Sequence, residues 1–114
     1  VTIVDEWPDD GLNSLYLDRR TAVVTLTHDP KLDDPALGVA IRSPAFYIGS
    51  LGSRKTHAGR VERLTEEGFS AAEINRIHGP VGLNVGAVSP AEIAVAILAQ
   101  VTKILHAKEQ KAAA

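Results

Sequence analysis

The 114-residue sequence contains no cysteine and no methionine. Without cysteine, disulfides, thiolate nucleophiles and thiolate metal ligands are all excluded. The absence also fits a reducing compartment, so we expect a cytoplasmic protein. Because position 1 is valine rather than methionine, we expect the chain to be a segment of a longer protein.

The net charge is also small, and long apolar runs are absent. A net charge of -2 gives no support to general binding of nucleic acids or membrane surfaces. The sequence has no run of 18 apolar residues and no recognisable signal peptide, so no membrane-spanning helix is expected. The hydrophobic content of 45% is still sufficient for one small domain with its own core.

Three short apolar runs predict β-strands, at residues 1–4, 22–26 and 45–48. They are rich in β-branched or aromatic residues and mostly unbroken, which is typical of strands covered on both faces. The segments between them carry helix signals. Strands that alternate with helices predict an α/β fold with a doubly wound, mostly parallel sheet flanked by helices.

Helix signals dominate the rest of the chain. Asp34-Pro35 is typical of an N-cap followed by proline at the first helical position. Residues 53–67 predict a helix that ends at Gly68. Capping boxes at residues 70–73 and 89–92 predict a short helix and a long C-terminal helix.

Polar and glycine-rich segments follow the predicted strands, where open parallel sheets bind ligands. They are residues 27–30, 49–57 and 78–86. In the second, Gly49 and Gly52 allow the backbone to turn and approach a ligand closely. Ser53 can cap the next helix, whose first amides attract anions. This loop is therefore the principal candidate for an anion site.

The order of charges along the helix at residues 53–67 opposes its dipole. Arg54, Lys55 and His57 lie at its start, and glutamates lie toward its end. Each unfavourable exposed charge costs about 0.3–1 kcal/mol, which a bound anion would offset. The alternative is a structural turn in which Arg60 and Arg63 pair with glutamates. The loop matches neither the dinucleotide fingerprint nor the phosphate-loop motif.

Several other residues have two interpretations each. Thr27-His28-Asp29 could supply a proton-transfer or metal-binding group, or Asp29 could cap a helix, and we favour the cap for Asp29. His57 and His78 are possible ligands, but the sequence alone fixes no mutual geometry for a zinc site and no metal is expected. Gly82 and its neighbouring glycines shape a pocket wall or permit an irregular loop.

Four ordered motifs together resemble the C-terminal Rossmann-like domain of the XdhC/CoxI family, the xanthine dehydrogenase accessory factors. They are Leu-Thr-His-Asp-Pro-Lys-Leu-Asp at 26–33, Tyr-Ile-Gly-Ser-Leu-Gly-Ser-Arg-Lys-Thr-His at 47–57, Ile-His-Gly-Pro-Val-Gly-Leu-Asn-Val-Gly at 77–86 and Ser-Pro-Ala-Glu-Ile-Ala at 89–94. The resemblance covers residues 1–106, with residues 107–114 expected to be a flexible tail. The family's glycine-rich turn after its first strand is absent, so the domain is expected to lack its first strands.

The resemblance implies a maturation factor that binds molybdenum cofactor (molybdopterin) and transfers it to a molybdenum hydroxylase client after a sulfur-donating enzyme has acted. The implied role is that of an accessory factor rather than a catalyst. A homo-oligomer is possible on separate grounds, because exposed strands in a truncated sheet would favour pairing between copies. Alternatives are a nucleotide-dependent oxidoreductase using NAD(P) and a structural or dimerisation module. On the leading interpretation Ser53, Arg54 and Lys55 hold anionic groups. The remaining positions implied for cofactor binding are Thr27, His28, Asp29, Gly49, Gly52, His57, His78 and Gly82.

Overall fold

The computed structural model describes residues 7–15, 17–27, 29–83 and 86–113. Its strands are β1 (Ala22–Thr25), β2 (Tyr47–Ser50) and β3 (Ile77–His78), in the order β1-β2-β3. Both pairings are parallel, with Val23 opposite Ile48 and Ile48 opposite Ile77. The parallel α/β prediction is confirmed. The strand predicted at residues 1–4 lies outside the described residues, and β3 was not predicted.

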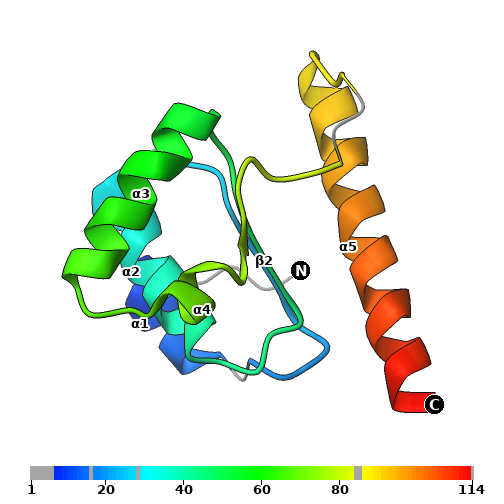
Figure 1. Cartoon of the computed structure of the whole chain (residues 1–114), viewed down its shortest axis with the longest axis horizontal. Helices are drawn as coiled ribbons and strands as arrows, with labels where there is room; N and C mark the ends of the chain where they lie inside the picture. The colour runs from blue at the N-terminus through cyan, green and yellow to red at the C-terminus, as the bar shows by residue number, and fades with distance from the viewer. Residues whose placement is uncertain (1–6, 16, 28, 84–85, 114) are drawn as a thin grey trace.

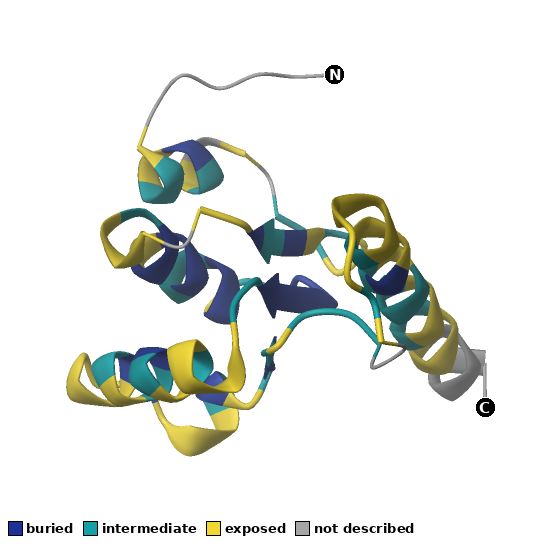
Figure 2. Ribbon diagram, turned by 90° about the horizontal axis from the view of Figure 1, so that it is seen from above, coloured by how far each residue is buried: buried dark blue, intermediate teal, exposed yellow. Residues whose placement is uncertain are grey.

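The helices lie on two sides of the sheet (Figure 1). On one side are α1 (Pro8–Ser14), α2 (Pro30–Ile41), α3 (Arg54–Glu66) and α4 (Ala71–Ile74). The long helix α5 (Pro90–Ala113) is alone on the other side, as the view in Figure 2 also shows. The described part of the chain therefore has three layers, and its two helical layers are unequal.

The start of α2 differs from the prediction. Asp34-Pro35 was expected to open this helix, but Asp29 is its N-cap and accepts a 3.0 Å hydrogen bond from the amide of Lys31. Proline at position 30 occupies the first helical position, so the same Asp-Pro signal operates five residues earlier. Pro35 lies inside the helix. The favoured role of Asp29 as a cap is confirmed.

The other predicted helix boundaries agree with the structure. Ser53 caps α3, and Gly68 follows its end with a φ of +101°, which glycine adopts readily. The capping box of Ser70 with Glu73 is complete. Helix α5 continues to Ala113, and the flexibility expected of residues 107–114 remains a prediction.

The core lies between the sheet and the α1–α4 layer. Arg76, which directly precedes β3, donates hydrogen bonds to the carbonyls of Ile41, Ser43 and Ala45 at one end of this core. These bonds tie the start of β3 to the segment that connects α2 to β2. The buried apolar cluster comprises Val23, Leu37, Ala40, Ile41, Ala45, Ile48, Leu64, Phe69, Ile74 and Ile77.

Helix α5 docks on the sheet through the buried Ala96 and through several polar groups. The hydroxyl of Tyr47 donates to Gln100 Oε1 at 2.5 Å, and the Gln100 side chain also makes two hydrogen bonds with the peptide of Gly82. Lys108 Nζ donates to the carbonyl of Phe46 at 3.0 Å. These contacts attach the helix to β2 and to the loop after β3.

Residues Pro90–Lys108 of α5 are long and apolar enough to span a membrane by length and composition. The sequence was expected to contain no such helix, because charged and polar residues interrupt its apolar runs. The measure is a weak indication, since helices of soluble proteins also satisfy it.

Candidate functional site

The loops that follow β2 and β3 meet α5 around a pocket at the carboxyl ends of the strands. The pocket has a volume of about 390 Å³. Its walls are mainly apolar or glycine, and Arg54 is its one charged residue among the described residues. The lining residues are Leu51, Gly52, Arg54, Pro80, Val81, Gly82, Leu83, Gly86, Ala87, Ile93 and Ala96.

The N-terminus of α3 borders this pocket. Ser53 Oγ accepts from the amide of Thr56 at 3.1 Å, and the Ser53 carbonyl accepts from the amide of His57. The amides of Arg54 and Lys55 have no acceptor among the described residues, as is usual for first-turn amides. No acidic residue lies in the first turn. The helix start is therefore electropositive and open to an anion.

Arg60 lies beneath this helix start and is only 2% exposed. Its guanidinium donates to the carbonyl of Leu51 at 3.1 Å and contacts His57 Nδ1 at 3.0 Å. Its Nε has no hydrogen-bond partner among the described residues. Because Leu51 belongs to the loop after β2, Arg60 holds that loop against α3. In the structural alternative to an anion site, Arg60 or Arg63 would pair with a glutamate, and the described contacts of Arg60 include none.

Arg63 likewise pairs with an aspartate rather than with a glutamate. Its Nε lies 2.6 Å from Asp34 Oδ2, and this carboxylate is buried. The hydrogen bond to Asp34 raises the pKa of Arg63. The pair joins α3 to α2, which explains why Asp34 is needed inside α2.

His57 is held by Arg60 and by the loop after β3. A guanidinium can only donate, so His57 Nδ1 accepts and the neutral ring carries its proton on Nε2. Burial, and then the charge of Arg60, lower the pKa of His57. A Cβ on Gly79 would lie 2.2 Å from His57 Nδ1. Only glycine fits at position 79 without displacing the ring.

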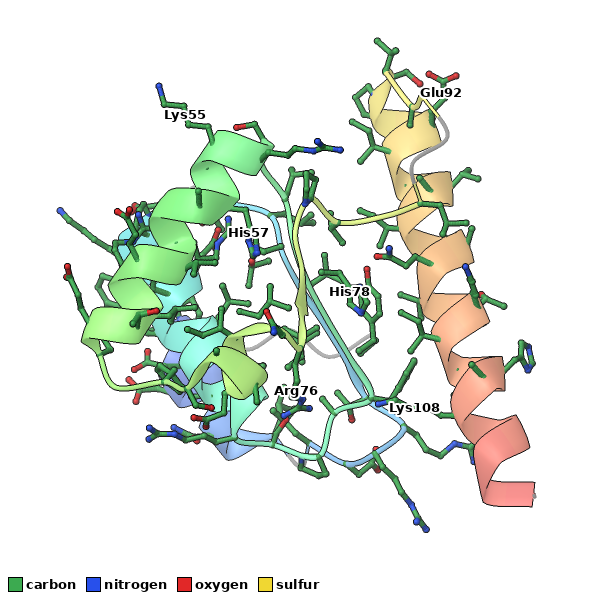
Figure 3. The ribbon with its side chains drawn as sticks, viewed as in Figure 1. Lys55, His57, Arg76, His78, Glu92 and Lys108 are labelled. Carbon is green, nitrogen blue, oxygen red and sulfur yellow. The ribbon has the colours of Figure 1, made fainter. Side chains whose placement is uncertain are left out.

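His78 lies on the other side of the sheet, facing α5 (Figure 3). Its ring stacks on Tyr47 with centroids 4.8 Å apart and planes 6° apart. Burial, and then the nearby charge of Lys108, lower the pKa of His78. Burial raises the pKa of Tyr47 to about 12, so its hydroxyl remains a donor to Gln100. This cluster attaches α5 and does not line the 390 Å³ pocket.

The polar side chains at the end of β1 and in the segment after it form hydrogen bonds within the protein. Thr25 and Ser50 join β1 to β2 through a buried 2.6 Å hydroxyl pair. Thr27 Oγ1 donates to Asp33 at 2.7 Å and accepts from the amide of Asp29 at 3.1 Å. These contacts give Thr27 and Asp29 structural roles at the start of α2.

The predicted site residues fall into separate groups. Gly52, Arg54 and Gly82 line the pocket, and Ser53 caps the helix beside it. Lys55 projects from α3 on the side away from α5 (Figure 3). Gly49 is buried in β2, where a Cβ would lie 2.4 Å from Val81 Cγ2.

Two of the three predicted pocket histidines, His57 and His78, are not brought together. His57 and His78 lie on opposite faces of the sheet, and neither lines the pocket. His28 lies outside the described residues. No group of three metal-ligating side chains occurs among the residues that the structure describes. Contact of these histidines with a cofactor remains a prediction.

Sequence reasoning missed four contributors to the site: Arg60, Gln100, Ile93 and Ala96. Gln100 shares α5 with the pocket residues Ile93 and Ala96, and all three face the sheet side. Gln100 could have been recognised from the sequence, because it is a polar residue within the otherwise apolar stripe of α5. No local signal identified Arg60, because its burial depends on the packing of α3 against the loop after β2.

Comparison with known proteins identifies the domain. The family model "XdhC Rossmann domain" matches residues 1–101. The molybdenum cofactor insertion chaperone PaoD of Escherichia coli K12 is 38% identical over 84% of this chain and 30% of that protein. A probable xanthine dehydrogenase subunit of Bacillus subtilis 168 is 29% identical over 87% of this chain and 28% of that protein.

The fold is also found in a crystal structure of a xanthine dehydrogenase from Bacillus halodurans. The TM-score is 0.77 and the identity 28%, over 96% of this chain and 32% of that chain. The chain thus spans about a third of the length of the relatives it matches. Its fold, its ordered motifs and the family model agree, and the chain belongs to the XdhC Rossmann-domain family.

Proposed function

We propose that this domain forms one wall of a molybdenum-cofactor site in a maturation factor for xanthine dehydrogenase-type enzymes. Membership of the XdhC Rossmann-domain family supports this proposal. So does the similarity to PaoD, which is named as a molybdenum cofactor insertion chaperone. The matched relatives are about three times longer, so the proposal assigns the domain one part of the task.

The observation that carries the proposal is the open start of α3 beside the apolar pocket. Molybdopterin combines a phosphate with a flat pterin, and a site for it needs an anion-binding end and an apolar wall. The free amides of Arg54 and Lys55 meet the first need, together with the Arg54 side chain. The pocket volume of about 390 Å³ is within the range of small-ligand sites.

Each wall of the pocket has a role on this proposal. The α3 start holds the phosphate, and Leu51, Val81 and Ile93 exclude water from the pterin face. When bound, the cofactor supplies the molybdenum that the client enzyme uses in catalysis. The described lining contains no carboxylate, histidine or cysteine. A site with one permanent cation and no general acid or base favours holding a ligand over transforming it.

The proposal also includes a client enzyme, a sulfur donor and a cellular compartment. The client is a xanthine dehydrogenase-type molybdenum hydroxylase, in keeping with the names of the B. subtilis and B. halodurans relatives. A sulfur-donating enzyme acts on the cofactor while it is held. Since the cofactor is transferred to an apoenzyme, the domain works where that apoenzyme is assembled, which we propose is the cytoplasm.

Removing the two cations at the α3 start tests the site. We expect Arg54→Ala with Lys55→Ala to lower the affinity for molybdopterin about tenfold or more, because the Arg54 side chain that lines the pocket loses a charge-assisted hydrogen bond worth about 1.5–3 kcal/mol. The measurement is a fluorescence titration of the chain with molybdopterin, with circular dichroism to verify folding.

Arg19→Ala with Arg20→Ala is the matched control. These two exposed arginines precede β1 and lie at the opposite, amino-terminal edge of the sheet. Their removal changes the net charge equally and should leave the affinity unchanged. Equal losses in both double variants would indicate non-specific charge attraction and contradict the proposed site. Tighter binding of NADP than of molybdopterin would favour the oxidoreductase alternative.

A further inference from the structure

The outward face of α2 forms the floor of a groove on the side of the sheet away from α5. Pro35, Gly38, Val39 and Arg42 follow one another at helical spacing, so they share one face of α2. All four line a hollow of about 540 Å³, here called the α2 groove. Helix α1 supplies one wall and the segment that follows α3 supplies the other. Figure 1 shows α1, α2 and α3 grouped on this side of the sheet. The groove therefore follows about two turns of α2.

The floor of the α2 groove is apolar and flat, because Gly38 at its centre has no side chain. The ring of Phe69 packs beside this glycine, since a Cβ on Gly38 would lie 3.2 Å from Phe69 Cζ. Leu12 of α1 and Val39 of α2 also line the groove and are half-buried. A flat floor with a glycine allows close approach of another backbone. The shape therefore favours a helix of a second protein over a compact small molecule.

The free charges along the α2 groove are negative. Asp9 lies on one wall and Glu67 on the other, and neither carboxylate has a hydrogen bond or an ion pair within the described part of the chain. The cations beside the groove are already engaged. The guanidinium of Arg42 lies 4.6 Å from the centre of the aromatic ring in the floor, and Arg63 pairs with Asp34. An apolar floor between acidic walls is complementary to a segment with an apolar face and basic flanks.

We propose that the α2 groove docks a basic amphipathic helix of a partner protein. The apolar stripe of that helix lies on Gly38 and Val39, and its lysine or arginine side chains reach Asp9 and Glu67. The groove shares no lining residue with the 390 Å³ pocket, so this inference is independent of the proposed cofactor site. A ligand and a partner protein can therefore be bound at the same time. Two helical turns bury less than the roughly 800 Å² per partner of a standard interface, so binding should be weak.

A designed peptide of about 15 residues, with leucine on one helical face and lysine elsewhere, is the probe for the groove. We expect it to bind the chain with a Kd of about 10–100 µM and to shift the amide NMR signals of Gly38, Val39 and Phe69. The same peptide with glutamate in place of lysine should not bind. Spermine, a polycation without an apolar face, should bind far more weakly. Shifts confined to α5, or equal binding of the glutamate peptide or of spermine, overturn the proposal.

Two pairs of isosteric substitutions test the acidic walls. Asp9→Asn with Glu67→Gln should weaken binding of the lysine peptide about fivefold, because two surface ion pairs are lost and each contributes little. Glu62→Gln with Glu66→Gln is the matched control, since it removes the same charge from exposed positions of α3 that do not line the groove. The control should bind like the unchanged chain. Equal losses in both pairs would indicate general charge attraction and overturn the proposal.

Two further variants test the floor. Gly38→Leu should abolish binding because its side chain occupies the space of the apolar stripe, and Val39→Lys should abolish it because its charge repels the lysine peptide. Circular dichroism verifies that each variant is folded. Val95→Lys is the control, since it makes the same change on an exposed position of α5. It should bind like the unchanged chain. Full affinity in either folded floor variant overturns the assignment of the helix to the α2 groove.

Discussion

At the scale of single residues, Arg60 connects the parts of the candidate site. It is buried, and it binds both the loop after β2 and the His57 ring that packs on Gly79. Burial lowers the pKa of Arg60, and the carboxylates of Asp33 and Asp34 oppose this effect. Because a buried cation is otherwise unfavourable, its retention here indicates that the loops depend on it.

Replacing this guanidinium tests its positioning role. We expect Arg60→Met to weaken molybdopterin binding about tenfold, because the Leu51 carbonyl loses its donor and the pocket wall is no longer held. Arg76→Met is the control, since Arg76 also binds backbone carbonyls but at the other end of β2. It should lower stability without changing the affinity. If both variants lose affinity in proportion to stability, Arg60 has only a structural role.

A matched pair of glycine substitutions tests the close packing of His57. Gly79→Ala should lower the unfolding free energy by about 1–3 kcal/mol, because its Cβ would overlap the His57 ring. Gly59→Ala makes the same chemical change inside α3, with only ordinary contact to Arg63. It should raise stability by about 0.5–1 kcal/mol. Urea unfolding measures both, and a neutral Gly79→Ala would contradict the packing described.

At the scale of elements, the attachment of α5 decides whether the pocket exists. One wall comes from the loops after β2 and β3, and the other from Ile93 and Ala96 of α5. The helix buries little of its own surface, and Gln100 provides three of its hydrogen bonds to the rest of the domain. The pocket therefore depends on these polar contacts together with the sheet-facing apolar side chains of α5, such as Ala96.

A double-mutant cycle measures this attachment. Gln100→Leu should lower the unfolding free energy by about 1–3 kcal/mol, because it leaves the buried Tyr47 hydroxyl and the Gly82 peptide unpaired. Tyr47→Phe should have a smaller effect. The double variant should lose about 1 kcal/mol less than the sum of the two, which is the coupling of residues in contact. Strict additivity would mean that the hydrogen bond does not exist in solution.

At the scale of the whole molecule, two half-buried histidines link stability to pH. Both His57 and His78 have pKa values lowered from 6.5, so the unfolded chain binds protons more readily than the folded one. Their contribution to stability is complete above about pH 6.5 and is lost as the pH falls toward their folded pKa values. The pKa values of Glu73 and Glu92 are also lowered, but from 4.5, so they act only in more acidic solution.

Unfolding free energies between about pH 7.5 and pH 5 isolate the histidine effect. We expect stability to decrease over this range, and His57→Gln with His78→Gln to remove most of the decrease. An unchanged slope in the double variant would show that neither ring is buried in its neutral form.

Local signals in the sequence predicted much of the fold. The apolar runs identified β1 and β2, and the caps at Ser53, Ser70 and Ser89 identified three helix starts. These features depend on neighbouring residues, so they can be recognised without the tertiary structure. The same reasoning misplaced the start of α2, because two Asp-Pro pairs carry equal local signals and only packing distinguishes them.

Residue patterns alone established the parallel α/β class, the helix caps and the position of a glycine-rich, basic loop after β2. Only the tertiary structure decided which residues lie around that loop. Arg60 is buried beneath it, His57 and His78 are separated by the sheet, and α5 supplies the opposite pocket wall. The physical reason is range: caps and strand patterns act over a few residues, whereas burial and pocket shape depend on segments that are distant in the chain.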